Sequence, residues 1–406
     1  ALNVPFSGLG GIVSFKLNPN LTSVTFAAST NAITTFQLNS CDITGAVDVS
    51  MLVFTNCNWN VNSNPNLTSI VFPTILTNCG INIRFCSGFT GVTFPPTTAT
   101  NIYMDFCDLT GTLDLTNVST FSDLLLNNNP LLTAINFTAH NDPCIRLKLN
   151  NCDLTGALDI SGLTNISNTN NIHGINVSIN TSLTSISLPT TGNNISLRIN
   201  SCNITGTLDF SMLTGIFYFN GSSNPLLTTL TLPTSTTPME LFFASSCALG
   251  YVDFTSLANM TDINGCSIDL QANSQTATEV TDEIMDLDEL SSGGFTGRLI
   301  NLAGTNAAIN DSVDRILSLD VAGTGYLASD VLTITGGGGT GGQITVNTVG
   351  GSGEILTYTL SAGGSGYTSQ PTSYTGGAGS GADFTVNGGE IAKTSLTAKT
   401  FTVTTT

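Results

Sequence analysis

Charged residues are scarce in this chain of 406 residues, and basic ones are the scarcest. Lys and Arg together number nine, against 27 Asp and Glu, which gives a net charge of −18. A nucleic-acid-binding protein neutralises phosphates with many cations, so this composition argues against nucleic acid as a partner. It argues equally against adsorption to an anionic membrane surface. No apolar run approaches the ~18 residues of a membrane-spanning helix, so we expect no membrane insertion.

The residues of common catalytic and metal sites are also sparse. The only two histidines, His140 and His173, fall outside the repeated motif described below and are predicted to lie in loops. The sequence contains no Cys-x-x-Cys pair, no Gly-x-Ser-x-Gly elbow and no His-Glu-x-x-His motif. The Gly-rich run 336–342 lacks the Lys-Ser/Thr of a phosphate-binding loop. We therefore predict a non-enzymatic protein without a cofactor or a metal site.

One motif recurs along the first two-thirds of the chain. It reads apolar, any, apolar, any, any, then Asn or Cys, as in Leu-Lys-Leu-Asn-Asn-Cys at 147–152. The two apolar positions alternate as in a short strand with one buried face, and the Asn or Cys is predicted to turn inward and satisfy backbone groups. The motif ends at twelve positions, 21 to 28 residues apart: Asn18, Cys41, Asn64, Cys86, Cys107, Asn129, Cys152, Asn180, Cys202, Asn224, Cys247 and Asn273.

The Cys and Asn copies alternate, which makes a two-coil module of about 45 residues. Asp/Asn-Ile/Leu-Thr-Gly follows a Cys coil and Pro-x-Leu-Thr follows an Asn coil, so the returning segments should be extended rather than helical. The coil that ends at Cys86 is an unpaired extra, and the longest step implies an inserted loop around 168–173. A column of aspartates is expected to cap turns, with calcium binding as the less favoured alternative: Asp48, Asp114, Asp159 and Asp209.

The composition changes after the repeats. Residues 276–290 have helical apolar spacing with several acids, which we expect to form a solvated helix face rather than a metal site. Residues 298–302 predict a strand and 311–317 a short helix. Further on, Gly-Thr-Gly-Tyr at 323–326 recurs as Gly-Ser-Gly-Tyr at 364–367, which predicts a duplicated β-hairpin unit. The expected parts are a solenoid at 1–274 with an N-terminal cap over 1–12, an α/β cap at 275–318, a Gly-rich β domain at 319–390 and a terminal β tail at 391–406.

The twelve motif copies resemble those of leucine-rich repeat proteins, whose repeats are ~20–29 residues long. Residues 321–390 resemble a Gly-rich β domain of tailed-bacteriophage virion proteins, on the strength of the two Gly-x-Gly-Tyr segments, residues 332–337 and residues 364–371. The fold class expected is mainly β: a leucine-rich-repeat solenoid with few helices, a short α cap and a small all-β Gly-rich domain.

The phage resemblance implies a virion surface protein such as a fibre, spike or capsid decoration. Its partners would be other virion proteins and copies of itself, in a homo-oligomer for which a trimer is a common form. The alternative is a secreted bacterial leucine-rich-repeat adhesin or surface-filament subunit, located outside the cell or at its surface. Both predict a protein that presents a surface for attachment or for contact between subunits.

The best candidate for a binding surface is the exposed, concave side of the motif strands. Asn and Arg beside occasional aromatic residues suit a host surface glycan or a polar protein face. The alternative interpretation is that any strand facing water needs polar residues, and that Asn ladders stabilise stacked coils. The candidate residues are Lys16, Asn60, Arg84, Tyr103, Lys148, Asn150, Arg198, Asn200 and Phe243.

The remaining conspicuous residues are expected to be structural. Trp59 takes an inward motif position and should belong to the core. The ten cysteines are expected to act mainly as small buried hydrophobes. If a disulfide forms, Cys86 and Cys107 are the favoured pair, because they end consecutive coils.

Overall fold

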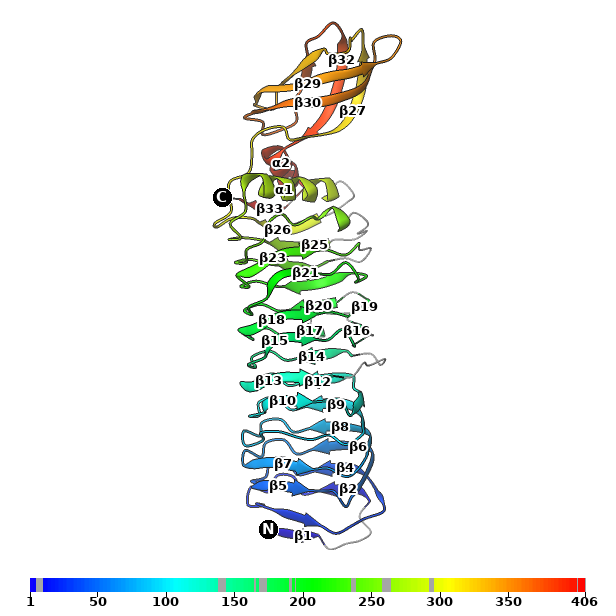
Figure 1. Ribbon diagram of the computed structural model, residues 1–406, viewed down its shortest axis with the longest axis vertical. Helices are drawn as coiled ribbons and strands as arrows, with labels where there is room; N and C mark the ends of the chain where they lie inside the picture. The colour runs from blue at the N-terminus through cyan, green and yellow to red at the C-terminus, as the bar shows by residue number, and fades with distance from the viewer. Residues whose placement is uncertain are drawn as a thin grey trace. The chain divides into compact units, whose positions relative to one another are not determined.

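The computed structural model describes residues 1–4, 10–137, 144–163, 166–167, 174–189, 192–193, 195–234, 239–257, 264–291, 296–399 and 401–405. The chain divides into two compact units, residues 1–227 and 228–406. Both are built mainly from β-strands, and the described residues contain two α-helices (Figure 1). The predicted mainly-β solenoid class is therefore confirmed.

The first unit is a β-solenoid in which the motif strands stack into one parallel sheet, here called the ladder sheet. Its inward residues align from coil to coil, as where Trp59 pairs with Phe36 on one side and Ile81 on the other. In spatial order the strands are β2 (Gly11–Ser14), β4 (Ala32–Gln37), β6 (Val53–Asn60), β8 (Leu76–Asn82), β9 (Thr97–Tyr103), β12 (Asp123–Leu125), β14 (Arg146–Lys148), β17 (Gly174–Asn176), β20 (Ile195–Arg198) and β22 (Ile216–Asn220).

The returning segments confirm the two-coil module. A strand from each Cys coil pairs in parallel with a strand from the following Asn coil: β5 (Gly45–Asp48) with β7 (Leu67–Val71), β10 (Thr110–Asp114) with β13 (Leu131–Asn136), and β15 (Thr155–Asp159) with β18 (Ser182–Ser187). The other strands of this region are β1 (Leu2–Val4), which pairs with β3 (Val24–Phe26), β11 (Val118–Thr120), β16 (Ile166–Ser167), which pairs with β19 (Gly192–Asn193), β21 (Thr205–Asp209), and β23 (Leu226–Thr231), which crosses the boundary between the units.

Every motif copy ends in the same backbone turn. The residue immediately before each of the twelve Asn or Cys positions has a left-handed conformation, with φ between 55° and 60°. None of these residues is Gly, although Gly adopts this conformation without strain. Most are small or polar, but Leu17, Phe85, Phe106 and the β-branched Ile179 are not. The turn is therefore imposed by its hydrogen bonds rather than by local preference: the residues are Leu17, Ser40, Ser63, Phe85, Phe106, Asn128, Asn151, Ile179, Ser201, Ser223, Ser246 and Ala272.

The motif Asn residues supply those hydrogen bonds. Asn129 is fully buried, and its Nδ2 donates to the carbonyl oxygens of Leu126 in its own coil, at 2.6 Å, and of Met104 in the preceding coil, at 2.9 Å. Its Oδ1 accepts the backbone N–H of Leu109, two residues after Cys107, at 3.2 Å. Asn64, Asn180 and Asn224 repeat all three bonds. Each motif Asn thus ties its own coil to the Cys coil before it, which confirms its predicted inward role.

The motif Cys residues make a weaker version of this contact. The Cys107 thiol donates to the carbonyl oxygen of Ile83 at 3.0 Å, and Cys86 donates to Val61 at 3.5 Å. The nine cysteines whose side chains are described are all buried thiols, Cys86 and Cys107 included. Trp59 is fully buried and its ring centroid lies 4.8 Å from those of Phe36 and Phe54, so its predicted place in the core is confirmed.

The second unit contains coils of the same kind. Four parallel strands stack in the order β24 (Leu241–Phe243), β25 (Asn264–Asp269), β26 (Thr296–Asn301) and β33 (Thr402–Thr404). Asn306 is a further inward Asn, because its Nδ2 donates to the carbonyl oxygens of Leu270 and Leu302, both at 3.0 Å. The helices are η1 (Thr255–Leu257, a 3-10 turn), α1 (Ala277–Ser291) and α2 (Gly389–Ala398).

Two local predictions for this unit are wrong. The helix expected at 311–317 is absent, because residues from Arg315 onward form a strand that pairs with the end of the Gly-rich domain. The β tail expected over 391–406 is mostly the helix α2, which packs on α1, and only Thr402–Thr404 form a strand. The predicted helix at 276–290 and strand at 298–302 are confirmed by α1 and β26.

The Gly-rich domain consists of two antiparallel sheets around one core. One pairs β27 (Arg315–Thr324) with β32 (Ser380–Asn387), and the other has the order β30 (Ile355–Ser365), β29 (Thr340–Val349), β28 (Val331–Thr335) and β31 (Ser373–Thr375). Tyr326 and Tyr367, the repeated tyrosines, are both buried in this core. Each copy of the Gly-Tyr segment therefore contributes one anchoring ring.

Candidate binding site on the ladder sheet

The outward side chains of the ladder sheet in unit 1 form a continuous surface, here called the ladder face. The strands pair in register, so equivalent residues stand in rows across neighbouring coils. One row runs Tyr103, Leu125, Lys148, Asn176 and Arg198 on β9, β12, β14, β17 and β20. Adjacent strands lie ~4.8 Å apart, so side chains on neighbouring coils can contact one another.

The structure places eight of the nine predicted site residues on this face. They are half-buried, except for Lys16, which is exposed just after β2. The ninth, Phe243, ends β24 in the second unit. The eight do not act alike: Asn60 Oδ1 accepts the backbone N–H of Asn62 at 3.2 Å, as Asn176 and Asn220 do for the residues two positions on. Those amide oxygens hold turns together within their own coils.

Arg84 is occupied by an ion pair. Its Nε and Nη2 atoms lie 2.5 and 2.7 Å from the two carboxylate oxygens of Asp105 on the next coil. Asp105 is fully buried beneath this contact. The Arg84 guanidinium also lies 5.3 Å from the ring centroid of Phe85, which stacks on Phe106 at 5.0 Å. Arg84 therefore stabilises the solenoid, because without it a buried carboxylate would lose its partner.

Tyr103 belongs to a second network, which includes two residues that the sequence analysis did not select. Arg146 donates to both carboxylate oxygens of Asp123, at 2.8 and 2.5 Å, and to the Tyr103 hydroxyl at 3.0 Å. The Tyr103 hydroxyl donates to Asp123 at 3.0 Å. Burial and the neighbouring Asp123 raise the pKa of Tyr103, so its hydroxyl remains a donor. Arg146 and Asp123 occupy the outward position just before the first apolar residue of the motif. The sequence analysis considered only the motif itself, so it did not include this position.

Lys148 and Arg198 differ from these two networks. In the described part of the chain the Lys148 ammonium has no hydrogen-bond or ion-pair partner. Burial, followed by repulsion from Arg198 and Arg146, lowers the pKa of Lys148 to about 8. The Arg198 guanidinium lies over the ring of Tyr218, 4.2 Å from its centroid. We call Arg146, Lys148, Arg198 and Tyr218 the basic cluster.

The distribution of charge singles out this face. All five Lys and Arg residues of unit 1 occupy ladder-face positions or extend directly from them. Of the described aspartates of unit 1, only Asp105 and Asp123 lie on the ladder face, and both form ion pairs there, with Arg84 and Arg146. A chain with a net charge of −18 therefore places the cations of its first unit on one surface.

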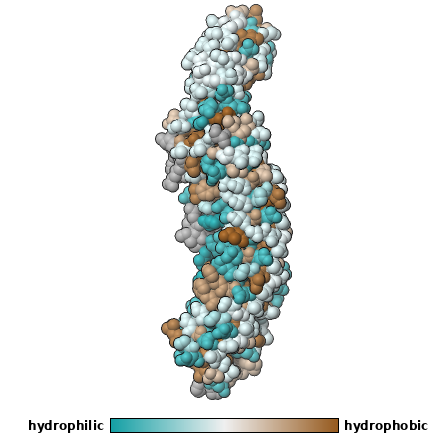
Figure 2. Space-filling view, turned by 90° about the vertical axis from the view of Figure 1, so that its left-hand side faces the viewer, coloured by the Kyte–Doolittle hydropathy of each residue, from teal (hydrophilic) through white to brown (hydrophobic). Residues whose placement is uncertain are grey.

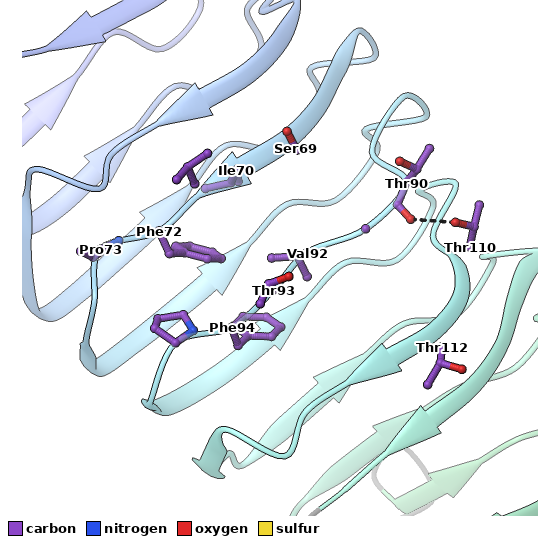
Figure 3. A pocket seen from close by; sticks show the side chains of 13 residues that line it. Ser69, Ile70, Phe72, Pro73, Thr90, Val92, Thr93, Phe94, Thr110 and Thr112 are labelled. Carbon is purple, nitrogen blue, oxygen red and sulfur yellow. Dashed lines mark hydrogen bonds between the residues drawn. The ribbon is translucent and has the colours of Figure 1, made fainter.

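A groove on the returning side is a second candidate (Figure 3). It lies where the extra coil ending at Cys86 has no return strand, between β7 and β10, and its volume is about 690 Å³. Thr110 closes one end by donating its N–H to the carbonyl oxygen of Thr90 at 2.9 Å. The lining is Ser and Thr hydroxyls with Phe72 and Phe94, and contains no titratable side chain. It could hold a neutral ligand but offers no acid or base.

Hydrophobic surface is dispersed on the face drawn in Figure 2, where brown residues form separate small patches among white and teal ones.

The aspartate column caps turns as predicted: Asp48, Asp114, Asp159 and Asp209 each accept the backbone N–H two residues on, at 2.8 to 2.9 Å, and Asp253 does the same. The described residues hold no group of three or more His, Cys, Asp or Glu that could bind a metal. His140 and His173 lie outside the described residues.

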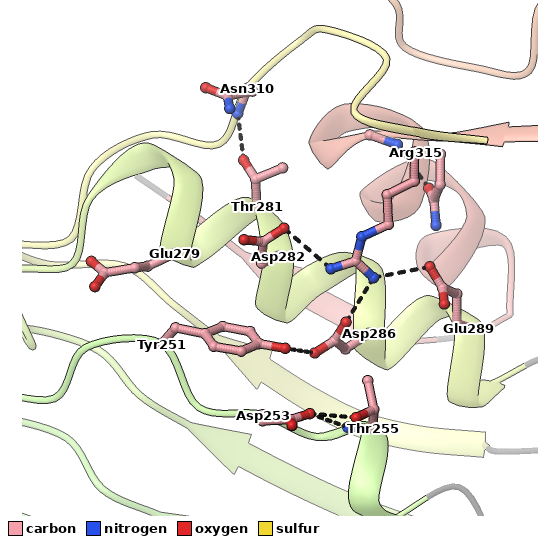
Figure 4. A network of polar contacts seen from close by, with 12 residues as sticks. Tyr251, Asp253, Thr255, Glu279, Thr281, Asp282, Asp286, Glu289, Asn310 and Arg315 are labelled. Carbon is pink, nitrogen blue, oxygen red and sulfur yellow. Dashed lines mark hydrogen bonds and ion pairs between the residues drawn. The ribbon is translucent and has the colours of Figure 1, made fainter. Parts of the chain in front are cut away.

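The acid-rich helix α1 is not the solvated face that was expected. Glu283 and Asp286 are buried, because α2 and the segment around Tyr251 cover the helix. Arg315 at the start of β27 binds Asp282, Asp286 and Glu289 at 3.1, 2.8 and 3.1 Å, and Tyr251 donates to Asp286 (Figure 4). These contacts attach the Gly-rich domain to the cap, so the cluster is structural.

We find no match to the chain among protein-family models, curated proteins or solved structures. Among the described residues, no helix combines the length and the apolar character required to cross a membrane. The class defined here is a β-solenoid with a Gly-rich β domain in its second unit and a basic cluster on the ladder face of its first.

Proposed function

We propose that the protein is a non-enzymatic structural protein of a phage virion that presents its ladder face for attachment to a host surface. It would be carried as a fibre, spike or capsid decoration, with copies of itself and other virion proteins as neighbours. The concentration of unit 1's cations on the ladder face carries the proposal, because an acidic scaffold gains nothing from such an arrangement unless that face meets a ligand. The leucine-rich-repeat character of the motif and the phage-like Gly-Tyr repeats supply the context.

Binding to intact host cells tests this proposal directly. The fluorescently labelled full chain should bind the cells in a saturable manner, and a triple variant Lys16→Met, Lys148→Met, Arg198→Met should lose most of that binding. Arg84 and Arg146 are left intact because their ion pairs support the fold. Equal binding by a correctly folded triple variant would contradict a role for the ladder face.

Assembly requires a separate measurement. Native mass spectrometry of the purified chain should show a homo-oligomer, which the proposal expects of a virion component. A monomer at every concentration tested would contradict the oligomer. Antibodies to the chain should also label purified particles in electron micrographs.

A surface-filament subunit or adhesin of a secreting bacterium is the second candidate. Strand β33 supports it, because in the described residues Thr402–Thr404 pair only with β26, which leaves the other strand edge available for a neighbouring chain. Antibody labelling of cells and filaments, rather than of particles, would favour this candidate.

A further inference from the structure

The groove on the returning side lies at a place where the solenoid lacks one strand. The ladder strands β6, β8 and β9 are consecutive, but the coil of β8 has no return strand, so β7 and β10 are two coils apart. At ~4.8 Å per coil their separation is about 9.6 Å, which is the width that one intervening strand would fill. Residues 90–94 run between β7 and β10 but form no strand, and a groove of about 690 Å³ remains (Figure 3).

Strand β7 turns unpaired main-chain groups toward this groove. The carbonyl oxygen of Val71 accepts the N–H of Val49 at 3.0 Å, on the side of β5. The main-chain groups of successive strand residues face opposite neighbours, so those of Ile70 and Phe72 face the groove. Both residues line it, and in the described chain their main-chain groups have no hydrogen-bond partner there. A strand edge of this kind is open to pairing with another strand.

Strand β10 presents an edge of the same kind from the other wall. The N–H of Leu115, just after the strand, donates to the carbonyl oxygen of Asn136 on the side of β13 at 2.9 Å. The alternation therefore directs the main-chain groups of Thr112 toward the groove. Beyond the bond that Thr110 makes at one end of the groove, residues 91–93 and the main chain of Thr112 have no hydrogen-bond partner among the described residues.

The lining of the groove limits what can fill it. It contains no titratable side chain, although the chain as a whole has a net charge of −18. A charged occupant would give up water without meeting a counter-charge, so the groove suits an uncharged one. Both walls carry main-chain donors and acceptors at the spacing of a strand, and an extended polypeptide presents the same groups on both of its edges.

We propose that this groove binds an extended, uncharged segment of another protein chain, which adds one strand between β7 and β10. In strand addition the main-chain hydrogen bonds give the affinity, and pockets for alternate side chains give the selectivity. Each of the two strands is five residues long, so the bound segment has about the same length. This site is separate from the ladder face and does not depend on attachment to a host. A neutral oligosaccharide is the alternative that the experiment must separate.

Fluorescence anisotropy with the full chain provides the test. The probe is a labelled pentapeptide with capped ends, Thr-Val-Ser-Val-Thr, which should bind in a saturable manner. Its counterpart with N-methyl groups on both valines lacks two main-chain donors, and it should bind at least tenfold more weakly. Unlabelled maltotetraose should not displace the peptide. The N-methylated peptide tests the main-chain hydrogen bonds without any change in the protein.

The variant Gly91→Trp fills the groove from within the protein. A Cβ atom added at Gly91 meets nothing within 4 Å and its φ is not left-handed, so the fold should tolerate the substitution. The indole should weaken peptide binding at least tenfold. Gly351→Trp is the matched control, because its added Cβ also meets nothing within 4 Å and it lies in the Gly-rich domain. It should leave the affinity unchanged, and circular dichroism shows whether each variant has folded.

Four results would overturn the inference: no binding of the peptide, equal binding of its N-methylated counterpart, an unchanged affinity in Gly91→Trp, or displacement of the peptide by maltotetraose. Displacement would assign the groove to a neutral sugar. Native mass spectrometry examines a second copy as the occupant. If Gly91→Trp dissociates a homo-oligomer while the original chain binds no peptide, the groove is a contact between copies. The triple variant of the ladder face keeps Gly91, so failure here leaves the attachment role standing.

Discussion

The ring of Tyr367 lies directly over Gly339, where an added Cβ atom would come within 2.3 Å of ring carbon Cγ. The other copy of the repeat has the same relationship, with Tyr326 over Gly379 at 2.4 Å. The tyrosine of the first copy thus packs on the glycine run of the second, and the reverse holds for the second tyrosine. The two copies complete each other's core.

Substituting one of these glycines should therefore destabilise the whole Gly-rich domain. Gly339→Ala forces a methyl group into a buried ring, and overpacking of this kind typically costs about 1–3 kcal/mol. Chemical denaturation followed by tyrosine fluorescence measures the change. Gly351→Ala is the matched control, because an added Cβ there meets nothing within 4 Å. Equal effects of the two substitutions would contradict the interlocked packing.

The motif Asn residues should be the most sensitive polar positions of the solenoid. Asn129→Ala removes three buried hydrogen bonds and leaves the groups of Met104, Leu126 and Leu109 without their partner. We expect a loss on the order of 3 kcal/mol in the free energy of unfolding. Asn127→Ala, two residues away on the half-buried ladder face, should cost less than about 0.5 kcal/mol. Comparable losses in both variants would mean that the inward bonds contribute little.

Cys57 and Cys79 are neighbouring thiols that we expect to form a disulfide on oxidation. Thr55 pairs with Thr77 and Asn58 with Gly80, so the two cysteines are aligned on neighbouring strands. Their thiols are hydrogen-bonded to each other. With oxidised glutathione, the two thiols should become one disulfide while the glutathione disulfide is reduced to two thiols. Peptide mass spectrometry after alkylation identifies the bond.

Cys57→Ser is the control for this reaction, because it should prevent the cross-link while a hydroxyl takes the place of the thiol. The cross-link closes a loop of about twenty residues and should stabilise the first unit by about 3 kcal/mol. Recovery of a Cys86–Cys107 peptide instead, or of no cross-linked peptide after prolonged oxidation, would show that the pair is misassigned.

The stability of the second unit should depend on pH through Glu283. Burial raises the pKa of this carboxyl from 4.5 to about 8. Between those values the folded chain holds a proton that the unfolded chain has lost. Stability is therefore greatest below 4.5 and falls toward pH 8, by ~1.4 kcal/mol per pH unit from this group. The variant Glu283→Gln, which keeps the acceptor for the Val252 N–H, should reduce this slope in urea titrations at several pH values.

Asp269, Asp286 and Asp314 also have pKa values raised by burial, so the slope should persist in part. The informative quantity is the difference between the original chain and Glu283→Gln at each pH. A difference that does not change between acidic and alkaline solution would contradict the assignment of the proton to Glu283.

The solenoid could be predicted because its signals are local and repeated. Each Asn or Cys occupies a buried position whose spacing the sequence displays directly. Asn306 was not predicted as an inward motif residue, because its turn contains one extra residue, Gly304, which breaks the motif spacing. The helix at 389–398 was not predicted because its Thr and Ser residues oppose the helix preference of its Ala, Glu, Lys and Leu residues, and its contact with α1 decides the outcome.

The site was predicted only in part, for a different reason. Lys148 and Arg198 followed from the strand alternation. Whether a cation on that face is free or paired depends on its neighbour one coil away, about twenty residues distant in sequence, as Arg84 and Asp105 show. The position before the apolar pair, which holds Arg146, Asp123 and Tyr218, would have appeared had the alternation been extended one step backward.

The three-way hydrogen bonding of the motif Asn has a consequence for how such a chain changes length. Each Asn side chain donates to a backbone carbonyl of the preceding Cys coil and accepts a backbone N–H from the turn of that coil. A Cys coil and the next Asn coil are therefore joined as a pair by hydrogen bonds. Removing or duplicating a pair would leave every such bond with an equivalent partner, whereas removing one coil would place two Asn turns or two Cys turns in succession. We therefore expect such a solenoid to change length by two coils at a time, and the single coil that ends at Cys86 is an exception to this rule.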